Sequence, residues 1–197
     1  MALLTTQQPS GPKSAVSRLL ATDPFLLGYA NCRESDQVAH FATETLVAFG
    51  GIRRHGLIGV ELEENMAKLE SELWPTVLEK LNALRTTTDR GAERIAADFL
   101  SDSMKGLGPK QARNLLQALG LTRYEIPIDS RVAKWLNDTG FPVPVGTKAL
   151  SDRKYYCFVL DGVHRLCDAA NEFPCVLDGA VFASFDGEGW NDRIVVF

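Results

Sequence analysis

The sequence predicts an all-α protein, and three observations indicate this fold class. Apolar residues recur at helical spacing along nearly the whole chain of 197 residues. Residues that cap or stop helices stand where one helical pattern ends and the next begins. Hydrophobic residues make up 45% and charged residues 23% of the chain, which is ordinary globular composition. We therefore expect about eight or nine helices, in one domain or two small subdomains.

The N-terminal part is predicted to hold an arm and one well-defined helix. Residues 1–12 are expected to be a flexible arm ahead of a folded domain over residues 13–197. A helix is predicted over residues 34–49, before Gly50 and Gly51 end it. Its residues at helical spacing are Val38, Phe41, Thr45 and Ala48.

The middle of the chain is predicted to form two further helical segments. Residues 61–84 favour helix, and Pro75 is expected to kink or divide them because it lacks an amide hydrogen. Thr88 or Asp89 is a suitable cap for the next helix. The apolar face expected for that helix comprises Ile95, Phe99 and Met104.

The C-terminal part is predicted to contain two helices. The first covers residues 151–173, after a capping Ser or Asp. Its apolar stripe comprises Tyr155, Val159, Val163 and Leu166. From residue 176 an apolar helix is expected to reach about Phe185, before a turn at residues 187–189 and an extended end.

Residues 93–120 have the pattern of two helices joined by a tight glycine turn. Gly106 and Gly108 permit positive φ and a close approach of the backbone. Pro109 suits the first position of a helix, and Gly120 suits the position after its end. Such a turn presents backbone N–H groups to an anion, for example a nucleic-acid phosphate. Many helix–helix turns use glycine for geometry alone, so the neighbouring residues decide the interpretation.

The next helix, over residues 129–138, is expected to begin at Asp129. Pro127 disfavours helix just before it, and Asp129 stands where an N-cap belongs. A helix over residues 109–119 is about 16 Å long, and the connecting segment is long enough to reach back across it. Lys110 and Asp129 are therefore expected to meet, each at the start of a helix.

A lysine in that position favours nucleophilic chemistry. The helix macrodipole disfavours the ammonium of Lys110, which lowers its pKa and makes the neutral amine more accessible. The Asp129 carboxylate acts in the opposite direction on that pKa, yet it stabilises positive charge on a sugar or helps to move a proton. The pair therefore suggests chemistry at a nucleotide sugar.

The run Gly106-Leu107-Gly108-Pro109-Lys110, followed by Asp129 at a distance of 19 positions, resembles a known family. It is similar to the helix-hairpin-helix (HhH-GPD) DNA glycosylases, specifically those of the 8-oxoguanine DNA glycosylase/AP lyase type. The resemblance implies two helical subdomains that flank an active-site cleft. The damaged base would be flipped out of the duplex, because its glycosidic bond is inaccessible within it.

The resemblance also implies the catalytic roles. The lysine at the Lys110 position attacks C1′ of the damaged nucleotide, expels the base and forms a Schiff base that permits β-elimination. The aspartate at the Asp129 position assists the attack and stabilises the oxocarbenium-like transition state. The expected function is base excision repair of double-stranded DNA by a monomeric intracellular enzyme, with 8-oxoguanine as the expected base.

Further site residues follow from the same resemblance. The residues expected to contact DNA are Gly106, Leu107, Gly108, Lys105, Arg113, Arg53 and Arg54. The carbonyl groups of Met104 and Gly106 would bind a structural K⁺ or Na⁺ ion. The candidates for stacking on the base are Trp190 and Phe185, with Phe197 as a competitor. The spacing of the four cysteines fits no iron–sulfur cluster, and no other cofactor is required.

The sequence departs from the family where relatives carry a Gln or Asn loop that wedges into the duplex. Here the corresponding stretch is Phe49 to His55, in which Arg53 and Arg54 are equally a surface turn or a DNA contact. The intercalating residue and the reader of the opposite base therefore remain unassigned.

The charge is unevenly distributed along the chain. The net charge of −4 excludes a uniformly basic nucleic-acid coat, but residues 104–134 carry six basic and two acidic residues.

One alternative function is that of a non-catalytic helix-hairpin-helix DNA-binding module, which needs the glycine turn but not Lys110 with Asp129. The other is an all-α protein-interaction domain, which needs neither. No stretch approaches the 18 apolar residues of a membrane helix.

Overall fold

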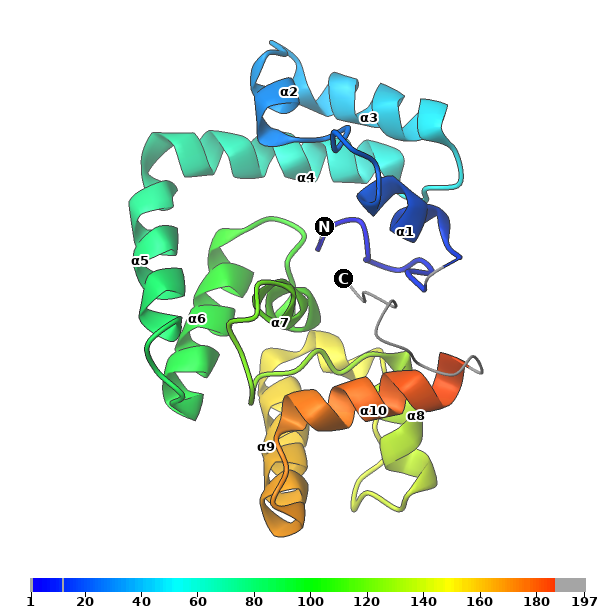
Figure 1. Cartoon of the computed structure of the whole chain (residues 1–197), viewed down its shortest axis with the longest axis vertical. Helices are drawn as coiled ribbons and strands as arrows, with labels where there is room; N and C mark the ends of the chain where they lie inside the picture. The colour runs from blue at the N-terminus through cyan, green and yellow to red at the C-terminus, as the bar shows by residue number, and fades with distance from the viewer. Residues whose placement is uncertain (1, 12, 187–197) are drawn as a thin grey trace. The chain divides into compact units, whose positions relative to one another are not determined.

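The computed structural model describes residues 2–11 and 13–186 of the chain. Within these residues it contains helices and no strand, which confirms the all-α prediction (Figure 1). The chain divides into two compact units. The described residues of unit 1 lie within Met1–Val77 and Met104–Gly106, and those of unit 2 within Leu78–Ser103 and Leu107–Asn191. None of the helices in the described ranges is long and apolar enough to cross a membrane.

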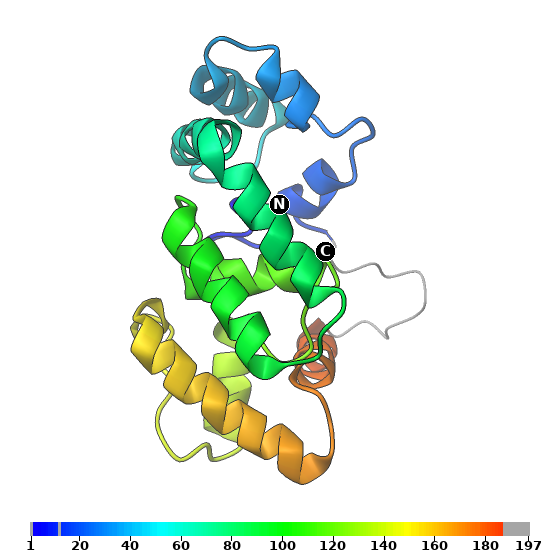
Figure 2. The same cartoon turned by 90° about the vertical axis from the view of Figure 1, so that its left-hand side faces the viewer.

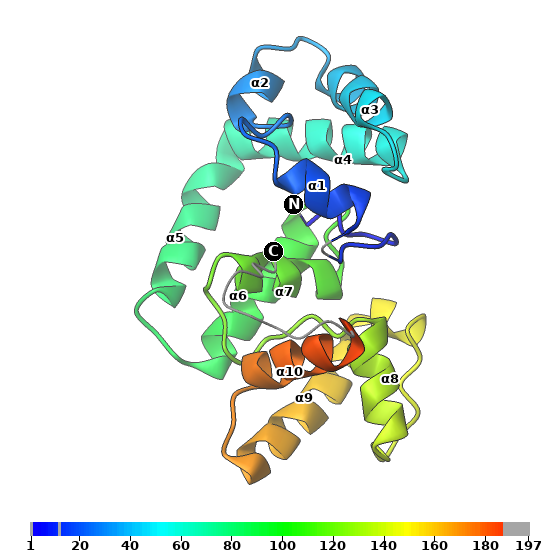
Figure 3. The same ribbon diagram turned by 45° about the vertical axis from the view of Figure 1, so that its right-hand side comes forward.

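Unit 1 is built around two helices that cross closely. Its elements are α1 (Ala15–Leu20), α2 (Tyr29–Arg33), α3 (Val38–Phe49), α4 (His55–Lys68), the π-helical turn η1 (Leu69–Leu73) and the start of α5 (Trp74–Leu84). Helices α3 and α4 lie side by side (Figures 1 and 3), and a Cβ added at Gly59 would lie 2.4 Å from the carbonyl oxygen of Ala39. Gly59 therefore permits the close contact of the two backbones.

The helix predicted over residues 34–49 begins later than expected but ends as predicted. Helix α2 ends at Arg33, and residues 34–37 connect it to α3, which begins at Val38. Gly50 and Gly51 have φ values of +81° and +75° and end the helix. The most buried residues of α3 are Ala42 and Leu46, which lie beside the predicted stripe.

The segment predicted to be a flexible arm is packed in the structure. Leu4 is 2% exposed and belongs to the apolar core of unit 1, together with residues of α1, α3 and α4. The side chain of Gln8 accepts a hydrogen bond of 2.7 Å from the backbone N–H of Arg53. The expectation of a free arm is therefore wrong for residues 2–11, because their apolar side chains complete the core.

Pro75 divides the predicted helix 61–84 by means of a wider turn. The helical segment begins earlier, at His55, and η1 separates α4 from α5 directly before Pro75. The N–H of Trp74 donates to the carbonyl of Leu69, one residue further back than in an α-helix. This wider turn accommodates the proline, which has no amide hydrogen and crowds the preceding turn.

Unit 2 contains the pair of helices around residues 93–120. Its elements are the rest of α5, then α6 (Arg90–Ser103), α7 (Pro109–Ala118), α8 (Ser130–Asp138), the 3₁₀ turn η2 (Ala149–Ser151), α9 (Arg153–Ala170) and α10 (Pro174–Asp186). Asp89 caps α6 as predicted, because its Oδ1 accepts a hydrogen bond of 2.7 Å from the N–H of Ala92. The predicted apolar face of α6 is wrong at Ile95, which is 64% exposed. The buried residues of α6 are Glu93, Ala96, Ala97 and Leu100.

A core of buried apolar residues in unit 2 involves α8, α9 and α10, which lie next to one another (Figures 1 and 3). Figure 2 shows α9 as one continuous helix, and Asp152 caps its start through a hydrogen bond of 2.8 Å from the N–H of Tyr155. Val159 and Val163 are buried as predicted, whereas Leu166 is 43% exposed. Helix α10 extends past Phe185, as predicted, and the predicted turn at residues 187–189 lies outside the described residues.

The packing of the N-terminal segment is tested by the substitution Leu4→Ala. Removal of a buried leucine side chain is expected to lower the free energy of unfolding by about 2 to 4 kcal/mol. Leu57→Ala is the matched control, because Leu57 is 57% exposed and its truncation is expected to change stability by less than about 0.5 kcal/mol. Denaturant titration measures both values. Equal, small effects would show that residues 2–11 do not stabilise the unit.

Candidate active site

Lys110 lies in the first turn of α7, as the sequence predicts. Gly108 is the N-cap and Pro109 the first helical residue, so Lys110 is the second. Helix α7 ends in a Schellman motif, in which Gly120 has a φ of +68° and the N–H of Leu121 donates to the carbonyl of Leu116. Both ends of the lysine helix are thus set by local sequence.

The turn before α7 requires a glycine at one of its two glycine positions. Gly106 has a φ of +77°, and a Cβ there would lie 2.6 Å from the carboxylate of Glu61. Asn65 holds the adjacent residue in place: its Oδ1 accepts from the N–H of Lys105 at 2.7 Å, and its Nδ2 donates to the carbonyl of Lys105 at 2.9 Å. Gly108 has an ordinary φ of −74°, so the expectation of positive φ is wrong at this position.

Asp129 caps α8, as predicted. Its Oδ1 accepts hydrogen bonds from the N–H groups of Arg131 and Val132, at 2.8 and 3.0 Å. Its Oδ2 accepts from Nε of Arg131 at 2.8 Å. Backbone donors and a guanidinium therefore occupy both oxygens of this carboxylate.

The amine of Lys110 lies in a partly buried, charged environment. Burial lowers the pKa of Lys110, Asp129 and Asp178 raise it by their negative charge, and Arg131 lowers it by its positive charge. The net result is a lowered pKa, in the predicted direction, with burial as the main cause. The neutral, nucleophilic amine is therefore more accessible than for a solvated lysine.

Asp178 is a third ionisable group at this site, and sequence reasoning missed it. It lies on α10, and its Oδ2 accepts a hydrogen bond of 2.9 Å from Nε2 of Gln117. Burial raises the pKa of Asp178 to about 6, against smaller opposing effects that include Gln117 and Lys110. The available signal was an isolated acidic residue within the otherwise apolar run from Val176 to Phe185.

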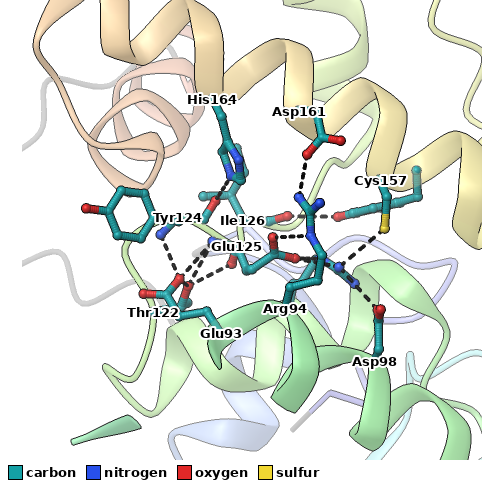
Figure 4. A network of polar contacts seen from close by, with 12 residues as sticks. Glu93, Arg94, Asp98, Thr122, Tyr124, Glu125, Ile126, Cys157, Asp161 and His164 are labelled. Carbon is teal, nitrogen blue, oxygen red and sulfur yellow. Dashed lines mark hydrogen bonds and ion pairs between the residues drawn. The ribbon is translucent and has the colours of Figure 1, made fainter. Parts of the chain in front are cut away.

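A buried network of ion pairs connects α6 and α7 to the segment that precedes Asp129 (Figure 4). Glu125 is fully buried, and its two oxygens accept from Nε of Arg94 at 3.0 Å and from Nε of Arg113 at 2.7 Å. Arg113 also lies 3.4 Å from Asp98 and donates to the carbonyl of Pro109 at 3.1 Å. The last contact joins the network to the first turn of the lysine helix.

This network overturns the prediction that Arg113 contacts DNA. The side chain of Arg113 is 0% exposed, and its guanidinium is occupied by Glu125 and Asp98. It also lies over the ring of Tyr156, 4.8 Å from the centroid. Position 113 lies on the buried face of α7, which the motif that carries the resemblance does not indicate.

A second buried carboxylate fixes the segment between α7 and α8 (Figure 4). Glu93 accepts hydrogen bonds from the N–H groups of Arg123, Tyr124 and Glu125, at 2.8 to 3.0 Å. Further along, the hydroxyl of Tyr156 accepts from the N–H of Ile128 at 2.7 Å and donates to the carbonyl of Ile126 at 2.8 Å. These contacts hold the chain that leads to Asp129.

The other residues predicted to contact DNA differ in their exposure and in their ion-pair partners. Arg54 is paired with Glu61 at 3.1 Å and only 19% of its side chain is exposed, which contradicts a role as a free DNA contact. Arg53 is exposed. Lys105 is exposed and lies 3.8 Å from Glu64. Leu107 is 5% exposed, so its side chain is part of the packing.

The predicted base-stacking residues have no established place at the site. Trp190 and Phe197 lie outside the described residues, and Phe185 is 40% exposed near the end of α10. The cation site at the carbonyls of Met104 and Gly106 stays a prediction. The local excess of positive charge is smaller than the sequence suggests, because Arg113 is buried and Lys134 pairs with Asp138 at 2.6 Å.

The buried ion pair between Arg113 and Glu125 is tested by a double-mutant cycle. Arg113→Met or Glu125→Gln alone is expected to lower the free energy of unfolding by about 3 to 5 kcal/mol, because the remaining charge stays buried without its closest partner. The double variant is expected to be less destabilised than the sum of the two single variants. Additive effects in denaturant titrations would contradict direct coupling of the two charges.

Comparisons with known proteins return no match, whether the chain is scanned against family models, searched against curated proteins or searched against solved structures. The site itself comprises the partly buried Lys110 and the two carboxylates, Asp129 and Asp178, that act on its charge.

Proposed function

We propose that this protein is a bifunctional DNA glycosylase/AP lyase that removes an oxidised purine from double-stranded DNA, with 8-oxoguanine as the favoured base. The observation that carries the proposal is a lysine in the first turn of a helix, with a lowered pKa and with the N-cap Asp129 close enough to act on it. A lysine with an accessible neutral amine is suited to covalent catalysis.

The connection of α6 to α7 supports the proposal as a helix-hairpin-helix motif. Gly106 adopts the positive φ that a tight turn requires, and Gly108 leaves open space where a side chain would stand. Helix α7 begins there, and the positive end of the helix macrodipole at such a start is suited to a DNA phosphate. A monovalent cation at the carbonyls of Met104 and Gly106 belongs to the same proposal.

The proposed reaction assigns separate roles to the two central residues. The neutral Lys110 amine attacks C1′ of a nucleotide that has been flipped out of the duplex, and the base departs with the electron pair. The Asp129 carboxylate, held in place by two backbone donors, stabilises the positive charge that develops on the sugar. The resulting lysine–sugar adduct then opens to a Schiff base, from which the 3′ phosphate is lost by β-elimination.

The nucleophile is tested by borohydride trapping on duplexes that contain 8-oxoguanine or other oxidised bases. The wild-type protein is expected to form a covalent adduct with DNA, and Lys110→Gln is expected to form none, because an amide cannot form a Schiff base. Lys154→Gln is a matched control: Lys154 is exposed and likewise occupies the second position of its helix, α9.

The outcomes separate the proposal from its alternatives. An adduct that survives Lys110→Gln would exclude Lys110 as the nucleophile. Binding of the duplex without any adduct by the wild-type protein would favour a non-catalytic DNA-binding module. Absence of both binding and adduct would favour a protein-interaction domain.

The role of Asp129 is tested by Asp129→Asn, which keeps a good N-cap but removes the charge. Excision measured in single turnover is expected to slow by about 100-fold or more, because the developing positive charge loses its counter-charge. Asp152→Asn makes the same change at the N-cap of α9 and is expected to leave excision unchanged. Unaltered excision by Asp129→Asn would limit Asp129 to helix capping.

A further inference from the structure

Asp178 is an ionisable group beside Lys110 that the proposed reaction leaves without a role. Lys110 and Gln117 are two turns apart on the same side of α7, and Gln117 donates to Oδ2 of Asp178. On α10, Phe182 is one turn after Asp178, and the guanidinium of Arg131 lies 3.9 Å from the centroid of its ring. The face of α10 that carries Asp178 is thus directed toward both α7 and the cap of α8.

Asp129 is poorly suited to exchange protons at this site. Two backbone N–H groups and the Arg131 guanidinium donate hydrogen bonds to its oxygens, so both oxygens are already occupied. Among the residues that the structure describes, Gln117 is the hydrogen-bond donor to Asp178. Asp178 therefore keeps one oxygen available for a proton.

We propose that Asp178 transfers the proton when the lysine–sugar adduct opens to the Schiff base. Its carboxylate takes a proton from the Lys110 nitrogen and gives it to the ring oxygen of the sugar. This inference rests on the proposed function. It assigns charge stabilisation to Asp129 and proton transfer to Asp178, two roles that one carboxylate would otherwise combine.

The step balances without any additional reactant. Attack forms the bond between Nζ and C1′ as the bond from C1′ to the base breaks, and the nitrogen is left with a positive charge and two hydrogens. The Asp178 carboxylate takes one of these protons. The nitrogen electron pair then forms the C=N bond, the bond from C1′ to O4′ breaks, and O4′ takes the proton from Asp178. The products are a protonated Schiff base, a 4′-hydroxyl and the regenerated carboxylate.

The titration of Asp178 agrees with this role. Burial is the main cause that raises its pKa to about 6, and Asp129 raises it further, whereas Gln117, Arg131 and Lys110 lower it. On α9, the negative charge of Asp178 also raises the pKa of Tyr156. A carboxyl group with a pKa near 6 is ionised before attack at neutral pH and is still acidic enough to return a proton.

The experiment compares two readouts on the same lesion duplex in single turnover: release of the free base and formation of the borohydride-trapped adduct. Both require attack by Lys110, so the ratio of adduct to released base reports the steps after attack. Asp178→Asn preserves shape and can still accept from Gln117. It is expected to lower the ratio about 100-fold at pH 7, because general acid–base catalysis is lost. Glu172→Gln, at an exposed carboxylate just before α10, is expected to leave the ratio unchanged.

The pH dependence gives a second measurement that needs only the wild-type protein. The carboxylate must be ionised to take the proton, so the ratio is expected to be constant above pH 7 and to fall as the pH decreases through about 6. A ratio that stays flat down to pH 5, or one that Asp178→Asn leaves unchanged, would overturn the role of Asp178. Absence of base release and adduct from the wild-type protein on every lesion duplex would instead overturn the proposed function.

Discussion

The burial of one negative charge, that of Glu125, constrains the geometry of the candidate site. A carboxylate without exposure is stable only if cations compensate it, and here Arg94 from α6 and Arg113 from α7 do so. The same Arg113 donates to the carbonyl of Pro109, directly before Lys110. The charge that stabilises the interior of unit 2 therefore also fixes the chain on both sides of the site, before Lys110 and before Asp129.

Local sequence rules predict the helix ends, and with them the positions of Lys110 and Asp129 at the starts of α7 and α8. The cap at Asp129, the proline at the start of α7 and the positive φ of Gly120 each depend on a few neighbouring residues. Patterns of apolar residues predict less, because Ile95 faces solvent while the charged Glu93 is buried on the same helix. A helical wheel orders residues by polarity alone. It cannot show that three backbone N–H groups of residues 123–125 donate hydrogen bonds to the buried carboxylate of Glu93.

The residues that sequence reasoning misplaced are those whose partners are far along the chain. The family resemblance implies that Arg113 contacts DNA, yet its partners are Glu125 and Asp98. Asp178 was missed because its hydrogen-bond donor is 61 positions away. The arm predicted for residues 1–12 is packed over residues 2–11, because buried apolar side chains such as Leu4 contact distant helices of unit 1. Long-range contacts of this kind leave no periodic signal.

The hydroxyl of Tyr156 forms hydrogen bonds with two buried backbone groups, because it accepts from the N–H of Ile128 and donates to the carbonyl of Ile126. Full burial keeps the phenol neutral by raising its pKa. Its single proton is already committed, so this tyrosine cannot serve as an acid, although it lies in the same unit as Lys110. It replaces the neighbouring strand that an extended segment usually requires, and so allows a piece of extended chain to exist inside a purely helical unit.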